Sequence, residues 1–406
     1  MSDSSDTYDV IIVGGGPAGT SAAIHLATSG ARVLLAEQKR FPRAKLCGEF
    51  ISPECLDHFA RLGVAESMTQ AGGAQVSETL FYSRRGASLS VPSHWFGAGQ
   101  ALALGLSRAE MDERLMLRAR DAGVHVLEEA RATGLLMKDG RVGGVRLKVC
   151  GGEREYRSRV GLDATGRSRA LARQIESAGP KERKRAPLVA FKAHLEGASG
   201  NPEHCEIYVY RGGYGGLSSV EGGLSNLCFI VSAQDARERN GDAQRVMREV
   251  LMTNRRAALT LARARPRSEW LGVALENFGR HEPAPAEGLL AVGDAASFID
   301  PFTGSGMLMA LESGEIAAQV VARWLERAGG ACPSYSLLAS DYRALYAERF
   351  NKRLRVCSVL RRAAFLPRLA EAAILALGAS TGVRRRLARA TRRSLINCNT
   401  GQYRLR

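Results

Sequence analysis

The 406-residue sequence predicts an α/β fold. We expect a nucleotide-binding domain with a parallel sheet, intertwined with a mostly antiparallel β domain and followed by C-terminal helices. Three observations predict this arrangement. Strand and helix patterns alternate over residues 7–50, strand patterns dominate residues 188–231, and residues 336–406 form a helical region with a basic tail. Hydrophobic residues make up 45% of the chain, which is enough for a large core in two domains.

The opening unit carries the strongest signal. Residues 8–13 form a buried-strand pattern, and residues 21–27 form a helix pattern rich in small side chains. Gly14, Gly16 and Gly19 stand between them at the G-x-G-x-x-G spacing. We expect the first glycine to permit a tight turn, the second to let the backbone approach a pyrophosphate, and the third to let the helix pack on the strand. A Rossmann-type dinucleotide site is therefore predicted.

The same site extends to the next strand, residues 32–37. Glu37 lies 18 residues after Gly19, close to the distance at which a carboxylate binds ribose hydroxyls. Pro17 and Ala18 complete the turn at the helix N-terminus, which faces the phosphate charge. The predicted cofactor-binding residues of this unit are Gly14, Gly16, Pro17, Ala18, Gly19 and Glu37.

Cysteine usage and terminal composition indicate the compartment. The eight cysteines are scattered and form no C-x-x-C pair, so neither a disulfide framework nor a zinc site is expected, and a reduced, cytoplasmic setting is favoured. Residues 1–6 are polar and acidic, unlike a signal peptide. No apolar run reaches about 18 residues, the length expected of a membrane-spanning helix.

The net charge of +16 is concentrated toward the C-terminus. An amphipathic stretch over residues 363–377, interrupted by Pro367, precedes a group of arginines: Arg384, Arg385, Arg386, Arg389, Arg392 and Arg393. Two interpretations stay open. The region docks peripherally on an anionic membrane surface, or the helix packs on the core and the tail is solvated. No nucleic-acid partner is expected, because no basic recognition motif is present.

The middle of the chain continues the nucleotide-binding domain. We expect a helix over residues 109–122, a strand over residues 124–127, a hairpin turning at Gly151 and Gly152, and then a separate strand over residues 160–166. Residues 188–231 follow as a mostly antiparallel sheet with substrate contacts, and residues 75–107 add strands to the same domain. The chain then returns to the first domain at residues 288–294. The expected boundaries are 1–74, 108–180 and 276–335 for the nucleotide-binding domain, 75–107 and 181–275 for the substrate domain, and 336–406 for the helical region.

A second motif begins at Gly293 and Asp294, just past a hydrophobic strand. A carboxylate at the end of a strand binds ribityl or ribose hydroxyls. Gly304 and Gly306 bring backbone N–H groups against a flat ring, and the helix starting near Met307 aims its positive end at that ring. The predicted cofactor-binding residues of this region are Gly293, Asp294, Pro301, Gly304, Ser305 and Gly306.

A third motif, Asp163-Ala164-Thr165-Gly166-Arg167-Ser168, completes a set of three in a fixed order. Together they closely resemble the FAD-binding fold of p-hydroxybenzoate hydroxylase-like flavoproteins. This resemblance implies non-covalent FAD, with Glu37 on the adenosine ribose, Asp294 on the ribityl chain, and Arg108 on the phosphates or ribityl. It also places Asp163 among the cofactor-binding residues.

Two further segments resemble geranylgeranyl reductase-like proteins: residues 45–53, which contain Cys47 and Gly48, and residues 300–306. That branch implies reduction of carbon–carbon double bonds in isoprenoid lipids. Cys47 would then lie near the reactive face of the flavin, where its thiol shields the ring or relays a proton. The alternative is a small residue that packs under the cofactor.

The sequence departs from these relatives in the substrate sheet. The aromatic-Trp-Phe-Pro motif of the reductases has no counterpart at residues 213–222. This absence weakens the inference that the protein shares their isoprenoid substrate. The Trp-x-Trp-x-Ile-Pro motif of flavin-dependent halogenases is also absent, because Trp95, Trp270 and Trp324 are isolated. We therefore do not expect halogenation.

Three functional classes follow from these observations. The favoured class is a C=C reductase acting on a hydrophobic isoprenoid- or polyketide-like substrate. The alternative is a monooxygenase that hydroxylates an aromatic or polyketide ring, which needs little beyond positioning and a dry pocket. A flavin-binding redox partner without turnover is the third. No second glycine fingerprint is found, so NAD(P)H that docks transiently, or a partner reductase, would supply the electrons.

The substrate pocket is expected between the flavin ring and the sheet that contains Tyr208, Tyr210 and Tyr214. Tyr214 and Cys47 are the candidate catalytic residues. For Tyr214 the alternative is an exposed turn position.

Overall fold

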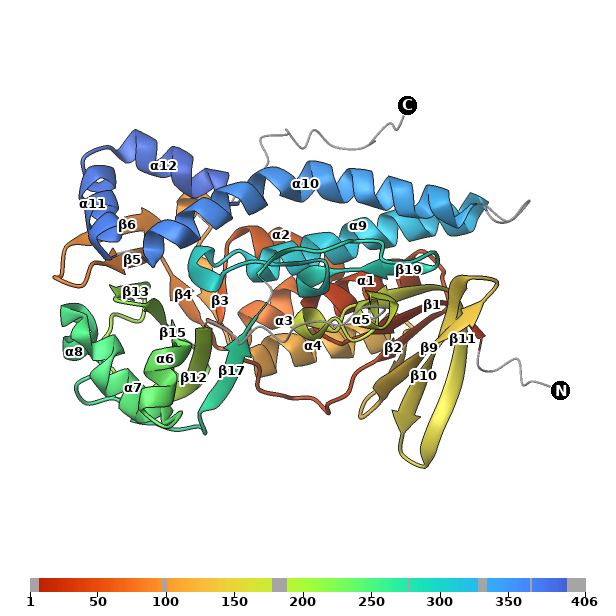
Figure 1. Cartoon of the computed structure of the whole chain (residues 1–406), viewed down its shortest axis with the longest axis horizontal. Coiled ribbons are helices and arrows are strands. Elements are labelled where there is room, and N and C mark those ends of the chain that lie inside the picture. The colour runs from red at the N-terminus through yellow and green to blue at the C-terminus, as the bar shows by residue number, and fades with distance from the viewer. Residues whose placement is uncertain are drawn as a thin grey trace.

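The computed structural model describes residues 7–96, 101–176, 188–276, 278–327, 334–365 and 367–392. Two large sheets lie side by side, and the long helices α9 (Gly306–Arg327) and α10 (Tyr335–Ala364) run along one side of the molecule (Figure 1). The α/β fold predicted from the sequence is confirmed.

The first sheet has seven strands in the order β8-β2-β1-β11-β10-β9, with β19 pairing β11. β1 lies parallel to β2 and β11, as expected of a nucleotide-binding sheet, and the antiparallel pairs are β10 with β11 and β10 with β9. Its strands are β1 Thr7–Val13, β2 Val33–Ala36, β8 His125–Leu127, β9 Arg131–Lys138, β10 Arg141–Val149, β11 Gly152–Asp163 and β19 Leu289–Ala291.

Alternating residues of β1 face two cores. Val10 and Ile12 pack against helices, whereas Ile11 and Val13 pack against the layer formed by β9 and β10. The helices on this sheet begin at recognisable residues: α1 has Pro17 at its first turn, and the Ser107 hydroxyl accepts a hydrogen bond from the Glu110 N–H at the start of α4. The helices of this half are α1 Pro17–Thr28, α2 Glu54–Leu62, α3 Ala65–Thr69, α4 Arg108–Asp121 and α5 Ala172–Glu176.

The hairpin at Gly151 and Gly152 is confirmed, but the expectation of a separate strand after it is wrong. β11 runs without interruption over 12 residues. Its first half pairs with β10 and its second half with β1, so the hairpin arm and the central strand are one element.

The second sheet has eight strands in the order β16-β12-β15-β14-β13-β5-β6, with β17 pairing β12. All pairs are antiparallel except β5 with β13. Its strands are β5 Glu78–Tyr82, β6 Ser88–Pro92, β12 Leu188–Glu196, β13 His204–Tyr210, β14 Gly213–Ser219, β15 Ser225–Ser232, β16 Arg265–Pro266 and β17 Leu271–Leu275. One face is covered by α6 Ala233–Glu238, α7 Ala243–Glu249 and α8 Arg255–Thr260.

The strands of residues 75–107 divide between two sheets. β5 and β6 join the substrate sheet, but β4 (Ala74–Val76) and β7 (Ala103–Gly105) pair with β3 (Phe50–Ile51) in a separate three-stranded sheet. A two-stranded ribbon is formed by β18 Gly279–Arg280 and β20 Ser297–Phe298. The domain boundaries expected from the sequence stay a prediction.

The C-terminal region contains α10 followed by α11 (Pro367–Gly378) and α12 (Thr381–Ala390). In Figure 1 these last two helices lie at the end of the molecule that carries β5 and β6, and α11 contacts β6 and β13. The part of the basic tail after Arg392 lies outside the described residues. Among the helices that the structure describes, none combines the length and the apolar character needed to cross a bilayer.

Candidate active site

A cavity of about 540 Å³ extends from the carboxyl ends of the parallel strands to the substrate sheet. This is the size range of small-molecule and cofactor sites. Most residues predicted for the site line it: Gly14, Gly16, Pro17, Ala18, Glu37, Cys47, Gly48, Arg108, Tyr214, Gly293, Asp294, Pro301, Gly304 and Gly306. Gly19, Asp163 and Ser305 are not among the lining residues.

Gly14 and Gly19 are required by the packing of the turn. Gly14 has φ +111°, and a side chain there would place its Cβ 2.2 Å from the Ala164 carbonyl oxygen. A Cβ at Gly19 would lie 1.9 Å from the Gly14 carbonyl oxygen. Only glycine therefore permits the close packing of α1 on the turn after β1. Gly16, in contrast, has only the Arg108 guanidinium within 4 Å of a would-be Cβ, at 3.9 Å, so its backbone is open to the cavity.

Glu37 at the end of β2 is buried and holds the turn together. Its carboxylate accepts hydrogen bonds from the Gly15 N–H at 2.8 Å and the Lys39 N–H at 3.0 Å, and Arg43 lies 3.4 Å away. A carboxylate accepts about four hydrogen bonds, so these contacts leave capacity for ribose hydroxyls. The position predicted for the adenosine ribose is therefore compatible with the geometry.

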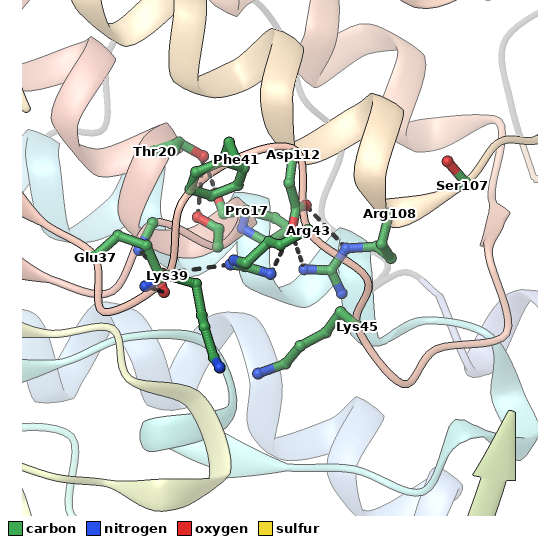
Figure 2. Close-up of polar contacts among 12 residues, drawn as sticks. Pro17, Thr20, Glu37, Lys39, Phe41, Arg43, Lys45, Ser107, Arg108 and Asp112 are labelled. Atoms are coloured by element: carbon green, nitrogen blue, oxygen red, sulfur yellow. Dashed lines mark hydrogen bonds and ion pairs between the residues drawn. The ribbon is translucent and has the colours of Figure 1, made fainter. Parts of the chain in front are cut away.

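A buried cluster of charges lies beside this turn. Figure 2 shows Arg43 and Arg108 converging on Asp112, while Lys39 and Lys45 extend away from the cluster. The Arg108 guanidinium donates to both oxygens of Asp112, at 2.9 and 2.7 Å, and Arg43 lies 3.2 Å from the same carboxylate. Burial disfavours the charge on Arg108, but Asp112 and the Cys47 thiol outweigh burial, so its pKa is raised. A permanent cation thus lies next to Gly16, where a pyrophosphate would approach.

Asp294 fits the predicted ribityl contact. It lines the cavity, and none of the described residues donates a hydrogen bond to its carboxylate. Burial raises the pKa of Asp294, against the opposing charges of Arg167, Lys45 and Arg108. The carboxylate is half-buried because the cavity reaches it, so hydroxyl groups of a ligand would satisfy it.

The loop before α9 forms the opposite part of the wall. Pro301–Thr303 is a short 3-10 turn, after which Gly304 has φ +61°. A Cβ at Gly304 would lie 3.4 Å from the Phe50 ring, so the loop of residues 301–306 approaches the segment that follows Gly48. Ser305 is fully buried and its hydroxyl pairs with Thr303 at 2.9 Å, which makes its side chain part of the loop and not of the lining.

The Cys47–Gly48 segment is held by side chains of the substrate sheet. Asn226 on β15 donates to the Cys47 carbonyl at 3.1 Å, and Lys192 on β12 donates to the Lys45 carbonyl at 3.2 Å. The Cys47 thiol is half-buried and accepts the Glu49 N–H at 3.4 Å. Cys47 therefore lies in the cavity wall, and its place at the reactive face of the flavin stays a prediction.

Glu49 also helps to hold the Cys47–Gly48 segment in place. It has φ 53°, and its buried carboxylate accepts hydrogen bonds from Lys192, from His194 at 2.6 Å and from the Arg108 N–H at 2.9 Å. Burial alone would raise the pKa of Glu49, but the His194 hydrogen bond and the Lys192 charge outweigh it, and the pKa is lowered. An ionised carboxylate thus joins α4, the Cys47 segment and the substrate sheet.

One predicted assignment is corrected. Asp163 does not reach the cavity, because its carboxylate accepts hydrogen bonds from the Thr165 N–H and hydroxyl and from the Leu171 and Ala172 N–H groups. It shapes the loop after β11.

Tyr208 and Tyr210 point to the other face of the sheet, into the core beneath α6–α8, because side chains alternate along β13. Tyr214 is buried in the cavity wall and is not an exposed turn residue.

Sequence reasoning missed the polar residues that hold the Cys47 segment. Lys192 and His194 interrupt an apolar strand, and Asn226 begins another. An isolated polar residue in a strand that otherwise reads as buried is the signal that could have found them. Their partners were not identifiable, because Lys192 and Glu49 are 143 residues apart in the sequence.

Two known proteins are similar to this chain over most of its length. A digeranylgeranylglycerophospholipid reductase from Methanopyrus kandleri is 29% identical over 327 residues, covering 79% of this chain and 78% of the relative. A menaquinone reductase from Mycolicibacterium smegmatis is 27% identical over 375 residues, covering 88% of this chain and 86% of the relative.

Two solved structures share the fold at 23% and 22% identity. A geranylgeranyl bacteriochlorophyll reductase-like protein from Thermoplasma acidophilum superposes with a TM-score of 0.78 and covers 95% of this chain and 96% of its own. A flavin-dependent brominase also has a TM-score of 0.78 and covers 95% and 93%. The family model described as an FAD binding domain matches residues 7–331, the larger part of the chain, and the protein therefore belongs to this family of FAD-dependent oxidoreductases.

Proposed function

We propose that this flavoprotein reduces carbon–carbon double bonds in a long-chain isoprenoid lipid. The observation that carries the proposal is the shape and chemistry of the cavity. Beyond Cys47 and Gly304 it continues into a lobe with aliphatic and aromatic walls. The proposal also rests on the curated relatives, whose names describe reductases of isoprenoid-bearing lipids.

The lobe is lined from two directions. The substrate sheet contributes Phe81, Leu89, Val91, Ile207 and Ile230. The C-terminal helices close the other side with Leu360, Ile374, Leu377 and Leu387. Such a lining binds hydrocarbon through the hydrophobic effect, at about 25 cal/mol per Å² of buried apolar surface. An extended polyprenyl chain suits this lobe better than a polar metabolite does.

The residues of the chain have separate tasks in this proposal. Arg108 and the turn at Gly16 hold the phosphates, Glu37 the adenosine ribose and Asp294 the ribityl chain. FAD, when bound and reduced, supplies a hydride. The anchored Cys47 segment and the loop of residues 301–306 position the ring and exclude water from it. NAD(P)H or a partner reductase delivers the electrons.

We further propose that α11 and α12 dock on an anionic bilayer from which the substrate enters. Their inner faces line the lobe, yet Leu369, Leu375 and Val383 are more than half exposed on the outside. Arg385 and Arg386 are exposed near them. Apolar residues beside arginines match the requirements of an interfacial helix on anionic lipid. Binding to phosphatidylglycerol vesicles that falls with added salt supports this, and equal binding to neutral vesicles, or none to either, contradicts it.

The decisive experiment is anaerobic. The purified holoprotein is reduced with dithionite and mixed with a polyprenyl alkene or with a phenolic lipid, with and without oxygen. We expect the alkene to reoxidise the flavin without oxygen and to yield the saturated product by mass spectrometry. Oxygen consumption stoichiometric with a hydroxylated product, together with no anaerobic turnover, would instead assign the protein to the hydroxylases.

A further inference from the structure

Tyr214 and Asp300 form a buried pair where the substrate sheet contacts the flavin-side loop. Tyr214 lies on β14 and lines the cavity, and its hydroxyl donates a short hydrogen bond to Oδ1 of Asp300. Each residue is only 4% exposed. Asp300 immediately precedes Pro301, so the pair connects the lobe that would hold the hydrocarbon with the loop expected at the flavin ring.

Asp300 lacks the partners that an ionised carboxylate needs. Oδ1 also accepts the Phe302 N–H at 3.0 Å, but Oδ2 is buried and has no hydrogen-bond partner among the described residues. An ionised oxygen without a partner is expensive to bury, whereas a neutral carboxyl group costs much less. The geometry therefore favours a protonated Asp300.

The residues around the pair also favour the neutral forms of its two side chains. Phe302 and Phe365 contact the Tyr214 ring at centroid distances of 5.1 and 6.1 Å. Burial raises the pKa of Asp300, opposed by the Tyr214 hydrogen bond, by the Phe302 N–H and by Arg361 on α10. Burial also raises the pKa of Tyr214. After burial, Asp300 contributes most to this increase, and Cys228 on β15 and Tyr210 on β13 contribute as well. Tyr214 thus retains its proton at neutral pH, and burial favours the neutral form of Asp300.

We propose that Tyr214, supported by Asp300, is the acid that protonates the substrate carbon during alkene reduction. The inference rests on the proposed function. In this step the C=C π bond breaks, the proton of the Tyr214 O–H bonds to one carbon, and the hydride from reduced flavin bonds to the other. The alkene gains two electrons and the flavin loses two. The Tyr214 oxygen is then a hydrogen-bond acceptor; the Asp300 carboxyl group turns its O–H toward that oxygen, returns a proton to it and is reprotonated from water.

Tyr214→Phe and Asp300→Asn test the proposal, because both substitutions nearly preserve shape. Tyr210→Phe is the matched control: Tyr210 is an equally buried tyrosine, its hydroxyl bonds to the Ile230 carbonyl at 2.8 Å, and it faces away from the cavity. We expect Tyr214→Phe to slow anaerobic reoxidation of the reduced flavin by the alkene about 10²–10⁴-fold, the range for a lost general acid. Asp300→Asn is expected to slow it less, and reoxidation by oxygen is expected to stay at the wild-type rate in all three.

A second readout does not depend on turnover. Infrared difference spectra between wild type and Asp300→Asn at neutral pH are expected to contain the carbonyl band of a protonated carboxylic acid, with or without FAD. Absence of that band, or a wild-type rate of alkene reoxidation in Tyr214→Phe, overturns the proposal that Tyr214 and Asp300 form an acid pair. Failure of the wild-type protein itself to reduce any alkene overturns the proposed function, and the acid pair with it. Turnover by wild type and Tyr214→Phe alike overturns the acid pair alone.

Discussion

Glu49 and Asp300 belong to the two loops that border the same cavity, and both are buried, yet their surroundings differ in kind. Glu49 accepts hydrogen bonds from charged Lys192, from His194 and from a helix N–H. Asp300 accepts from a neutral hydroxyl and one N–H, and one of its oxygens has no partner among the described residues. The pKa of Glu49 is lowered by its partners, and that of Asp300 is raised by burial.

This contrast distinguishes two uses of one functional group. An ionised carboxylate held by a buried cation is suited to fixing a loop, because removal of either partner leaves an unpaired charge. A neutral carboxyl group is suited to holding a proton that chemistry consumes. Environments that drive two carboxyl pKa values apart are a recurrent sign of divided roles in active sites. We therefore assign anchoring to Glu49 and proton supply to Asp300.

The largest effect is expected from Glu49→Gln. The substitution keeps the shape but leaves the Lys192 ammonium buried without its counter-ion, so the free energy of unfolding should fall by about 3–5 kcal/mol. Urea denaturation followed by circular dichroism measures the change. The control is Glu155→Gln, which removes an exposed pair with Arg146 and should leave stability unchanged. A loss as small as in the control would mean that Glu49 does not anchor the segment.

Asp294 is a third carboxylate at this cavity, and its proposed role is to bind the cofactor. Because no described residue donates to it, Asp294→Ala should weaken FAD binding by roughly 1–3 kcal/mol, the cost of lost hydrogen bonds to a charged group. Glu37→Ala should have an effect of similar size. Isothermal titration of the FAD-free proteins gives the affinities, with Glu196→Ala on the exposed end of β12 as a control. Unchanged affinity in both variants would reject the two assigned roles.

The dinucleotide half could be predicted from the sequence because its signals are local. Gly14, Gly16 and Glu37 lie within one β-α-β unit, where spacing along the chain fixes position in space. Asp294 was identifiable for the same reason, as it follows a hydrophobic strand directly.

The polar pairs around the cavity could not be predicted in this way. Tyr214 and Asp300 are 86 residues apart, and the sequence alone does not specify which strands of the second sheet face the cavity. Tyr208 and Tyr210 illustrate the difficulty. Their strand was recognised correctly, but only the observed register places their side chains on the face beneath α6–α8.

The two carboxylates should also respond to pH in opposite directions. Because the pKa of Asp300 is raised, its contribution to stability is present below the ordinary carboxyl pKa and is lost as pH rises through the raised value. Because the pKa of Glu49 is lowered, its contribution is present above the ordinary value and is lost as pH falls through the lowered one. As pH rises from below the ordinary carboxyl pKa, Asp300→Asn should therefore lose less stability than wild type. Parallel pH profiles for the two proteins would contradict a protonated Asp300.

The smallest effect is expected from Cys47→Ala. The segment around Cys47 is held through main-chain carbonyls by Asn226 and Lys192, and these hydrogen bonds survive loss of the thiol. FAD affinity should stay at the wild-type value, and the free energy of unfolding should change by no more than about 0.5 kcal/mol.

If the thiol only shields the ring, anaerobic reoxidation by the alkene should slow far less than in Tyr214→Phe. Stopped-flow traces of the two variants under identical conditions decide between them. A larger defect in Cys47→Ala would make Cys47 the proton donor, whereas full activity would make it a packing residue.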